Sequence, residues 1–305
     1  MTGPVVVIGD ALIDELRDDS GVREFVGGAA LNVAVGLSRL GVSTALIAMV
    51  GDDEAGDHIR SFLADFGVRL IPTASPLGTA RAVSTRSGGG EPEYVFNEAS
   101  QRRRIRYGDA ERAAIAEAPL VAISCIALDD LAQTRELGEV LSATGVRFAI
   151  DPNPRTGMLS DRAEFVRGFE GLAASATLVK VGEDDATLLY GEPLDTLRAR
   201  LIDLGAGAVL ATYGSAGAAI EAGGAVVNRP ISALPGRIVD TMGAGDAAFA
   251  ATLAALLDRS PGNQDEWGDV LQYAMDVAAA TCRFEGALLR LPRALEDDDI
   301  DRIGT

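Results

Sequence analysis

The amino-acid sequence predicts an α/β fold, a three-layer α/β/α sandwich with a mostly parallel central sheet and a small appended β-sheet. Short apolar runs alternate along the chain with segments of helical periodicity, which is typical of a parallel sheet with helices on both faces. Four of these helical segments are followed by a glycine, the residue that helix C-termini favour: Gly41, Gly67, Gly145 and Gly205. With 305 residues, 48% of them hydrophobic, the chain can bury one large core or two modest ones.

The expected strands of the central sheet are short and rich in apolar residues. They are Val5–Ile8, Thr44–Val50, Leu120–Ser124, Val146–Ile150, Ala176–Val181 and Ala208–Thr212. The helices expected between them are Ala30–Leu40, Glu54–Phe66, Asp109–Glu117, Asp130–Ala143, Arg162–Ala173 and Thr196–Leu204. A short strand at Arg237–Val239, two alanine-rich helices at Gly245–Leu257 and Asp265–Arg283, and a solvated terminal helix around the acidic run Glu296–Asp299 complete the prediction.

Two stretches, Leu12–Val26 and Ala80–Phe96, alternate apolar with polar residues and do not follow the α/β pattern. The second contains the glycine-rich segment Ser87–Pro92, which is typical of a hairpin turn. We expect both to form a small antiparallel sheet, with strands at about residues 12–26 and 80–97. Because no repeat or low-complexity linker separates this sheet from the rest, residues 1–305 are predicted to be a single domain.

The charge of the chain argues against two classes of partner. Its 27 basic and 45 acidic residues give a formal net charge of −18, which repels both nucleic acid and anionic lipid. No apolar stretch is long enough to span a membrane, and residues 1–10 have no basic segment ahead of their apolar run. We therefore expect a cytoplasmic protein with a small-molecule substrate.

The residue types present also restrict the chemistry. His58 is the only histidine, in a segment typical of a surface helix, so histidine-dependent triads and relays are excluded. Cys125 and Cys282 have no metal-ligand spacing and are expected to be small hydrophobic residues. Carboxylates, backbone amides, arginine and the single lysine, Lys180, remain. That lysine either marks a site that arginine cannot fill or has survived by chance in an arginine-rich sequence.

The strongest local motif is Asp240–Asp246, with the sequence DTMGAGD at the start of an expected helix. Its small residues let a ligand approach the backbone, and free N–H groups at a helix N-terminus bind anions. Asp246 is placed to accept a hydroxyl proton while these N–H groups stabilise a transferring phosphoryl group. The alternative is that Asp246 is an ordinary residue of a first helical turn.

A glycine pair, Gly27 and Gly28, opens the first helix and forms a second motif. Asn32 falls one turn inside this helix, where its amide can bond a sugar hydroxyl, and Gly28 leaves room for a ring. Asp14 follows the first strand and can approach the carboxyl edge of the sheet, where open α/β folds bind ligands. The structural alternatives are a packing glycine pair, a buried Asn and a solvated acidic turn residue.

The third motif, Asp151–Arg155 with the sequence DPNPR, follows the strand that ends at Ile150. Two prolines stiffen this loop, and Arg155 can direct its planar set of N–H donors at hydroxyls or a carboxylate. The alternative is a Pro/Asn turn that carries a surface arginine.

Together these motifs resemble the ribokinase-like, or PfkB, family of sugar kinases over Val5 to about Leu291. Gly27–Gly41 is similar to the N-terminal signature of the family, and Asp240–Asp246 is similar to its C-terminal GAGD signature. The DPNPR segment is similar to that of bacterial fructokinases. The resemblance implies a ribokinase-like sandwich with a lid, ATP and Mg²⁺ as requirements, K⁺ as a further ion, and a homodimer formed through the β lid.

The resemblance also implies roles for individual residues. Asp246 would be the catalytic base, and the backbone of Gly243, Ala244 and Gly245 the anion hole. The sugar would be held by Asp14, Gly27, Gly28, Asn32 and Arg155. The nucleotide would be bound by Lys180, Thr212, Gly214, Ser215 and Gly217. A monovalent cation would be bound by Asp240, Thr241 and Gly286.

The sequence departs from the family at the metal site and at the adenine pocket. The NxxE motif that organises magnesium-bound water is replaced by Gly182–Asp185, so Asp185 is the expected metal ligand through water, and Glu183 or Asp184 are the alternative ligands. Met275 occupies a position where many members have Asn.

We expect ATP-dependent transfer to a primary hydroxyl of fructose or a related ketose. The alternative acceptors are a ketoacid sugar, similar to 2-keto-3-deoxygluconate, and a nucleoside, and a non-catalytic sugar-binding regulator is a further alternative.

Overall fold

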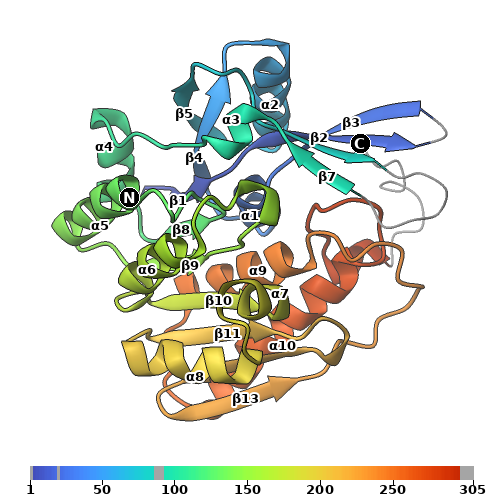
Figure 1. Ribbon diagram of the computed structural model, residues 1–305. Coiled ribbons are helices and arrows are strands. Elements are labelled where there is room, and N and C mark those ends of the chain that lie inside the picture. The colour runs from blue at the N-terminus through green and yellow to red at the C-terminus, as the bar shows by residue number, and fades with distance from the viewer. Residues whose placement is uncertain (1–2, 19–20, 86–92, 296–305) are drawn as a thin grey trace.

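A nine-stranded sheet runs through the centre of the protein, shown in Figure 1 as a computed structural model that describes residues 3–18, 21–85 and 93–295. Its strand order is β13-β12-β11-β10-β9-β8-β1-β4-β5. The strands are β1 (Val5–Gly9), β4 (Thr44–Gly51), β5 (Arg69–Ser75), β8 (Val121–Ser124), β9 (Phe148–Asp151), β10 (Leu178–Gly182), β11 (Ala208–Thr212), β12 (Ala218–Ala222) and β13 (Ala225–Arg229). Only β12 runs antiparallel to its neighbours, so the predicted mostly parallel sheet is confirmed.

The sheet separates two hydrophobic cores, because successive strand residues point to opposite faces. In β1, Val5 and Val7 contribute to one core, whereas Val6 and Ile8 contribute to the other. One face is covered by α1 (Ala29–Arg39), α2 (Glu54–Asp65), α9 (Ala244–Asp258) and α10 (Gln264–Thr281). The other face is covered by α4 (Asp109–Glu117), α5 (Leu131–Thr144), α6 (Arg162–Ala173) and α8 (Leu194–Leu204). The three-layer sandwich is therefore confirmed.

A four-stranded sheet, which we call the lid, projects from one end of the sandwich (Figure 1). Its strands are β2 (Leu12–Asp18), β3 (Gly21–Gly27), β6 (Arg81–Thr85) and β7 (Glu93–Phe96), in the order β3-β2-β6-β7. The two expected hairpin pairs are antiparallel, but β2 pairs with β6 in parallel, so the sheet is mixed. The turn predicted at 87–92 and the helix predicted around 296–299 lie outside the described residues. Dimerisation through the lid stays a prediction.

One predicted element is wrong. Arg237–Val239 forms no strand, because the Val239 and Asp240 N–H groups both donate to the Cys282 carbonyl and have no strand to pair with. Ile238 is 56% exposed, as expected for an apolar residue with no sheet face to bury it. Within the described residues, the strands β5, β12 and β13 were not predicted, nor were the short helix α3 (Glu98–Gln101) and α7 (Glu183–Asp185) with the π-turn Ala186–Tyr190 that follows it.

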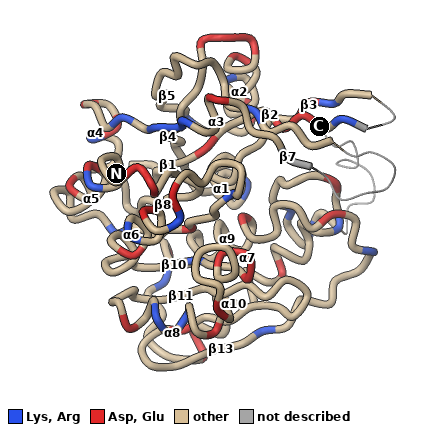
Figure 2. Tube along the Cα trace, viewed as in Figure 1, with Lys and Arg blue, Asp and Glu red and all other residues tan. Residues whose placement is uncertain are grey.

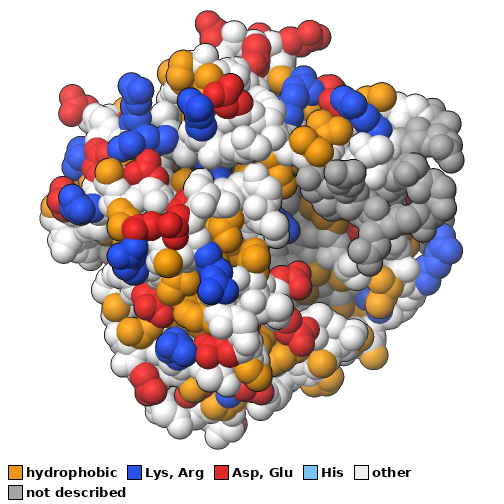
Figure 3. Space-filling view, viewed as in Figure 1, with side chains coloured by type: hydrophobic (Ala, Val, Ile, Leu, Met, Phe, Trp, Pro, Cys, Tyr) orange, Lys and Arg blue, Asp and Glu red, His pale blue; other side chains and the backbone are white. Residues whose placement is uncertain are grey.

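The surface is mixed in charge despite the large net charge. Acidic and basic residues are interspersed along the trace in Figure 2 and are intermixed on the face shown in Figure 3. Among the described residues, no helix combines the length and the apolar character needed to cross a membrane. His58 is exposed on α2, as predicted, and Cys125 is buried, whereas Cys282 is only partly buried.

Candidate active site

The carboxyl ends of β9 and β10 bring together a buried ion pair between Asp151 and Lys180. Val179 pairs with Ile150, so Lys180 stands level with Asp151. Both side chains point to the α9 face, since their strand neighbours Ile150 and Val179 face the opposite core. The Lys180 Nζ lies 3.1 and 3.3 Å from the two Asp151 carboxylate oxygens, and the two residues are 7% and 0% exposed.

The N-terminus of α9 lies directly beside this pair. Gly243 precedes the helix with a φ of 72°, and a Cβ there would lie 2.0 Å from the Ala287 carbonyl oxygen, so only glycine fits. A Cβ on Gly245 would lie 3.3 Å from the Lys180 Nζ, which places the ammonium against the first helical turn. The Ala244 N–H donates to the Thr241 carbonyl at 3.3 Å, and the other N–H groups of this turn have no partner within the helix, an arrangement that suits the binding of an anion.

Asp246 lies in the same first turn and is 9% exposed. The Asn32 Nδ2 on α1 donates to the Asp246 Oδ2 at 2.9 Å. Burial raises the pKa of Asp246 to about 6, although the Asn32 hydrogen bond and the charges of Lys180 and Arg155 favour the ionised form. A buried carboxylate with this pKa is suited to accept a proton near neutral pH. This hydrogen bond therefore connects the DTMGAGD motif with the motif that contains Asn32.

The start of α1 and the beginning of the lid form the wall opposite α9. The Asp10 Oδ1 accepts the Ala30 N–H at 2.9 Å, and Gly28 has a φ of 116°. A Cβ on Gly27 would lie 2.1 Å from the Asp14 Oδ2, so glycine is needed for that carboxylate to occupy this position. Burial and the neighbouring Asp10 raise the pKa of Asp14 to about 6. These contacts hold the Asp10 carboxyl just after β1 and the Asp14 carboxyl on the lid strand β2.

Arg155 follows β9 in the proline-flanked loop and is exposed. Burial of its guanidinium group would lower the pKa, but the neighbouring Cys125, Asp246 and Asp10 outweigh this effect and the pKa is raised. Its N–H donors therefore remain charged and available among the carboxyl groups of the cleft. The loop is held in a strained conformation, since Asn153 has a φ of 39°.

The residues predicted to bind nucleotide lie in β10, at the end of β11 and in the turn after β11, and the two strands are adjacent in the sheet. Gly182 pairs with Thr212, and the turn Gly214–Ala216 follows directly. A Cβ on Gly214 would lie 3.9 Å from the Glu183 Oε2, so the two predicted regions face each other. Gly217 has a packing role instead, because a Cβ there would lie 2.1 Å from the Arg229 carbonyl oxygen.

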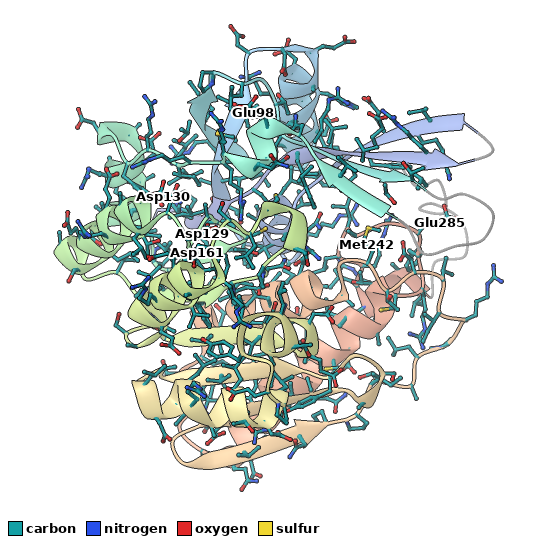
Figure 4. All side chains as sticks on the ribbon, viewed as in Figure 1. Glu98, Asp129, Asp130, Asp161, Met242 and Glu285 are labelled. Atoms are coloured by element: carbon teal, nitrogen blue, oxygen red, sulfur yellow. The ribbon has the colours of Figure 1, made fainter. Side chains whose placement is uncertain are left out.

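The predicted metal ligands form two separate groups. At the start of α7, the Asp185 Oδ2 accepts the Gly182 N–H at 2.6 Å, and burial raises the pKa of Asp185 to about 6. In the loop that leads through Met242 into α9 (Figure 4), Asp240 accepts N–H groups from Met242 and from Gly286. Thr241 beside it is exposed. Within the described ranges, no three His, Cys, Asp or Glu side chains form a ready metal site.

A small pocket with a free volume of about 20 Å³ lies beneath the lid at the ends of β1 and β8. Asp10, Cys125, Met158 and Arg103 line it. The Arg103 guanidinium is buried and donates to four backbone carbonyls, those of Ser100, Cys125, Ile126 and Met158. Sequence reasoning missed Arg103 and gave no role to Asp10, although the basic run RRRIR at 102–106 and the proximity of Asp10 to Asp14 were visible signals.

Residues 4–294 match the family model of the pfkB family carbohydrate kinases. The chain belongs to this family. A fructokinase from Klebsiella pneumoniae is 29% identical to it over 312 residues, which cover 99% of this chain and 99% of that protein. The family resemblance inferred from the two glycine motifs is confirmed, as is the predicted enzyme class, a phosphotransferase that acts on a sugar.

Solved structures support the same fold for this pfkB-family kinase. An aminoimidazole riboside kinase from Salmonella enterica, complexed with aminoimidazole riboside and an ATP analogue, matches with a TM-score of 0.78 and 25% identity, covering 96% of this chain and 98% of that one. A fructokinase from Xylella fastidiosa with bound ATP matches with a TM-score of 0.80 and 21% identity, covering 96% and 97%. The ribokinase-like fold is therefore confirmed.

Proposed function

We propose that this pfkB-family kinase transfers the γ-phosphoryl group of ATP to a primary hydroxyl of a small neutral sugar, fructose or a related ketose. The observation that carries the proposal is the position of Asp246. Its carboxylate lies at the anion-binding start of α9, accepts the Asn32 N–H, and faces the wall that carries Asp10. A proton acceptor, a phosphoryl site and hydroxyl-binding groups thus meet at one point.

The transfer follows from these positions. Asp246 takes the proton of the sugar hydroxyl as the hydroxyl oxygen forms its bond to the γ-phosphorus, and the bond from that phosphorus to the leaving ADP oxygen breaks. The N–H groups of Gly245 and its neighbours, together with the Lys180 ammonium, stabilise the negative charge of the transferred group. Asp14, Asn32 and Arg155 orient the sugar, and the lid excludes water from the reaction.

The nucleotide and its cation fit the edge formed by β10 and β11. Thr212, Gly214 and Ser215 offer backbone and hydroxyl groups to the nucleotide next to Lys180. Asp185 and Glu183 would hold Mg²⁺ through water, because Asp185 uses only one oxygen to accept the Gly182 N–H. When bound, Mg²⁺ neutralises phosphate charge. Asp240, Thr241 and Gly286 are the proposed monovalent cation site, with K⁺ as the ion.

The pocket next to Asp10 bears on the choice of acceptor. Asp10 and Arg103 both line it, and because Arg103 already donates to four backbone carbonyls, Asp10 is the group that can accept a hydrogen bond from a sugar hydroxyl. A second candidate acceptor is an acidic sugar such as a ketoacid sugar, which the charges of Arg103 and Arg155 favour. The acidic groups Asp10 and Asp14 oppose it, so we prefer the neutral ketose.

A coupled assay of ADP release tests the proposal. Purified protein with ATP and Mg²⁺ is offered a panel of ketoses, aldoses, ketoacid sugars and nucleosides, and the Asp246→Asn variant serves as the matched control. We expect turnover with fructose or another ketose that is lost in the variant. Turnover only with acidic sugars would favour the second candidate, and turnover only with nucleosides would overturn the proposed acceptor class.

A further inference from the structure

We propose that Asp151 is a positioning residue that holds the Lys180 ammonium at the start of α9, where it contacts the terminal phosphoryl group of the donor. The inference rests on the proposed function, since it assigns a task within the same phosphoryl site. It adds a role for Asp151, which touches neither substrate and acts only through Lys180. It also explains why the single lysine of the chain stands at this position.

The Asp151 carboxylate binds the Lys180 ammonium and fixes its orientation. The whole Asp151 side chain is buried, and both of its oxygens lie within 3.3 Å of the Lys180 Nζ. The ammonium has three N–H donors, and the bonds to Asp151 fix its position on the β9 side. Its other side faces Gly245, where an added Cβ would lie 3.3 Å from the Nζ.

The charges around Lys180 keep it protonated. Burial alone would lower the pKa of Lys180, but the carboxyl groups of Asp151, Asp185 and Asp246 outweigh burial and raise it. The raised pKa favours a charged ammonium that interacts with both the catalytic carboxyl and the predicted metal ligand. In this position it offsets their repulsion of an incoming phosphate.

A role in stability alone accounts poorly for this pair. Removing two charges from water costs more than a buried ion pair usually returns, and apolar residues of similar volume often stabilise a protein as well or better. Arginine would pair with Asp151 in two parallel bonds, yet its planar fork needs the space that Gly245 leaves to the ammonium. The compact ammonium of Lys180 fits beside Gly245, which has no Cβ, and this arrangement leaves room for a phosphate.

Calorimetry of nucleotide binding tests the proposal without turnover. The probes are the non-hydrolysable analogue AMP-PNP and ADP, each with Mg²⁺, titrated into the full-length protein and four variants: Asp151→Asn, Lys180→Met, the double variant and Lys180→Arg. We expect Lys180→Met to weaken AMP-PNP binding about 10-fold, the effect of losing one hydrogen bond to a charged group. ADP binding should change little, since ADP lacks the terminal group.

The remaining variants separate positioning from folding. Asp151→Asn should weaken AMP-PNP binding selectively, and the double variant should be no worse than Lys180→Met, because Asp151 has no task without Lys180. The double variant contains neither buried charge, so it can be studied even if Asp151→Asn does not fold. Lys180→Arg keeps the charge and should still weaken AMP-PNP binding.

The matched control is Ser124→Ala. Ser124 pairs with Asp151 in the sheet register, is fully buried, and its Oγ has no hydrogen-bond partner. Loss of the Ser124 hydroxyl tests whether any substitution at this buried position disturbs nucleotide binding. We expect AMP-PNP binding to stay unchanged. Wild-type binding of AMP-PNP in Asp151→Asn, or an equal loss of ADP affinity, would overturn the positioning role. Failure of the wild type to bind either nucleotide would instead overturn the proposed function.

Discussion

At the scale of single residues, the cleft concentrates carboxyl groups in an environment that disfavours their charge. Burial raises the pKa values of Asp14, Asp185 and Asp246 to about 6, and burial also raises that of Asp10. A carboxyl group whose folded-state pKa is raised destabilises the folded protein at pH values above its unfolded pKa. The buried carboxyl groups therefore lower the stability of the folded protein while they suit proton transfer. Single substitutions should change both stability and turnover.

The Asp246→Asn variant should lose turnover and gain stability. We expect kcat to fall by at least about 100-fold, the low end for a positioned general base, with the sugar affinity nearly intact. The variant should melt at a higher temperature at pH 8, because it no longer buries a charged carboxylate. A shift of about two pKa units sets the gain in the free energy of unfolding at about 3 kcal/mol at most. At pH 5 the wild-type carboxyl is already protonated, so the gain should shrink. Kinetics and melting curves at both pH values check this, and unchanged turnover would refute the catalytic assignment.

Asn32 should set the acid limit of the reaction. Its amide donates to the Asp246 Oδ2 and favours the ionised form, as do the charges of Lys180 and Arg155, whereas Asp10 opposes it. Asn32→Ala removes the hydrogen bond, so the pKa of Asp246 should rise and the acid limb of the kcat profile should move to higher pH. A pH profile of kcat at saturating substrates measures the shift. A limb that stays in place or moves to lower pH would contradict it.

Arg155 should act on the acceptor and hardly on the donor. Its guanidinium lies among Asp10, Asp246 and Cys125 in the acceptor part of the cleft. Arg155→Ala should therefore raise the KM for the sugar with little change in the KM for ATP. Steady-state kinetics with each substrate varied in turn make the measurement, and equal changes in both constants would mean that the loop supports the whole site instead.

At the scale of elements, two glycines at the start of α9 have different tasks and allow a matched comparison. Gly243→Ala places a Cβ at a φ of 72° and 2.0 Å from the Ala287 carbonyl, so both stability and turnover should fall. Gly245 is helical and meets only the Lys180 side chain, so Gly245→Ala should keep or raise the melting temperature while turnover falls. Melting curves and kcat of the two variants test the difference. A lower melting temperature of Gly245→Ala would show that its backbone, and not its space for the ammonium, matters.

The elements also show what the sequence can predict and why the rest escapes. Apolar runs buried on both faces and helices closed by glycine are local signals, so the strands β1, β4 and β8–β11 and the helices between them were predicted near their true bounds. The edge strands β5 and β13 contain half-buried or polar residues and have no such pattern. The parallel contact of β2 with β6 depends on segments far apart in the sequence.

The same limit applies to the candidate site. Asp246 and Asn32 were singled out from separate motifs, yet their hydrogen bond joins residues 214 positions apart. Asp151 was seen only as the first residue of a turn, because its partner Lys180 lies on the next strand. Arg103 lay in a basic run, and only the fold shows that its guanidinium bonds three separate segments under the lid.

At the scale of the whole molecule, the net charge of −18 repels ATP and has no effect on a neutral sugar. ATP carries negative charge, so the field of the protein reduces its concentration near the cleft, whereas a neutral ketose does not respond to that field. The local cations Lys180 and Arg155 act only within a few ångströms of the reacting groups. Salt screens the long-range part of this field first, because its range falls from about 30 Å at 0.01 M to about 8 Å at 0.15 M ionic strength.

Raising the ionic strength over this range should therefore lower the KM for ATP and leave the KM for a neutral sugar unchanged. An acidic sugar would behave like ATP, so the same experiment separates the two candidate acceptors. Kinetics in NaCl and in KCl at equal ionic strength, with free Mg²⁺ held constant, distinguish screening from binding of K⁺ near Asp240. A KM for ATP that rises with salt in both media would mean that Lys180 and Arg155 attract the nucleotide more strongly than the remaining surface repels it.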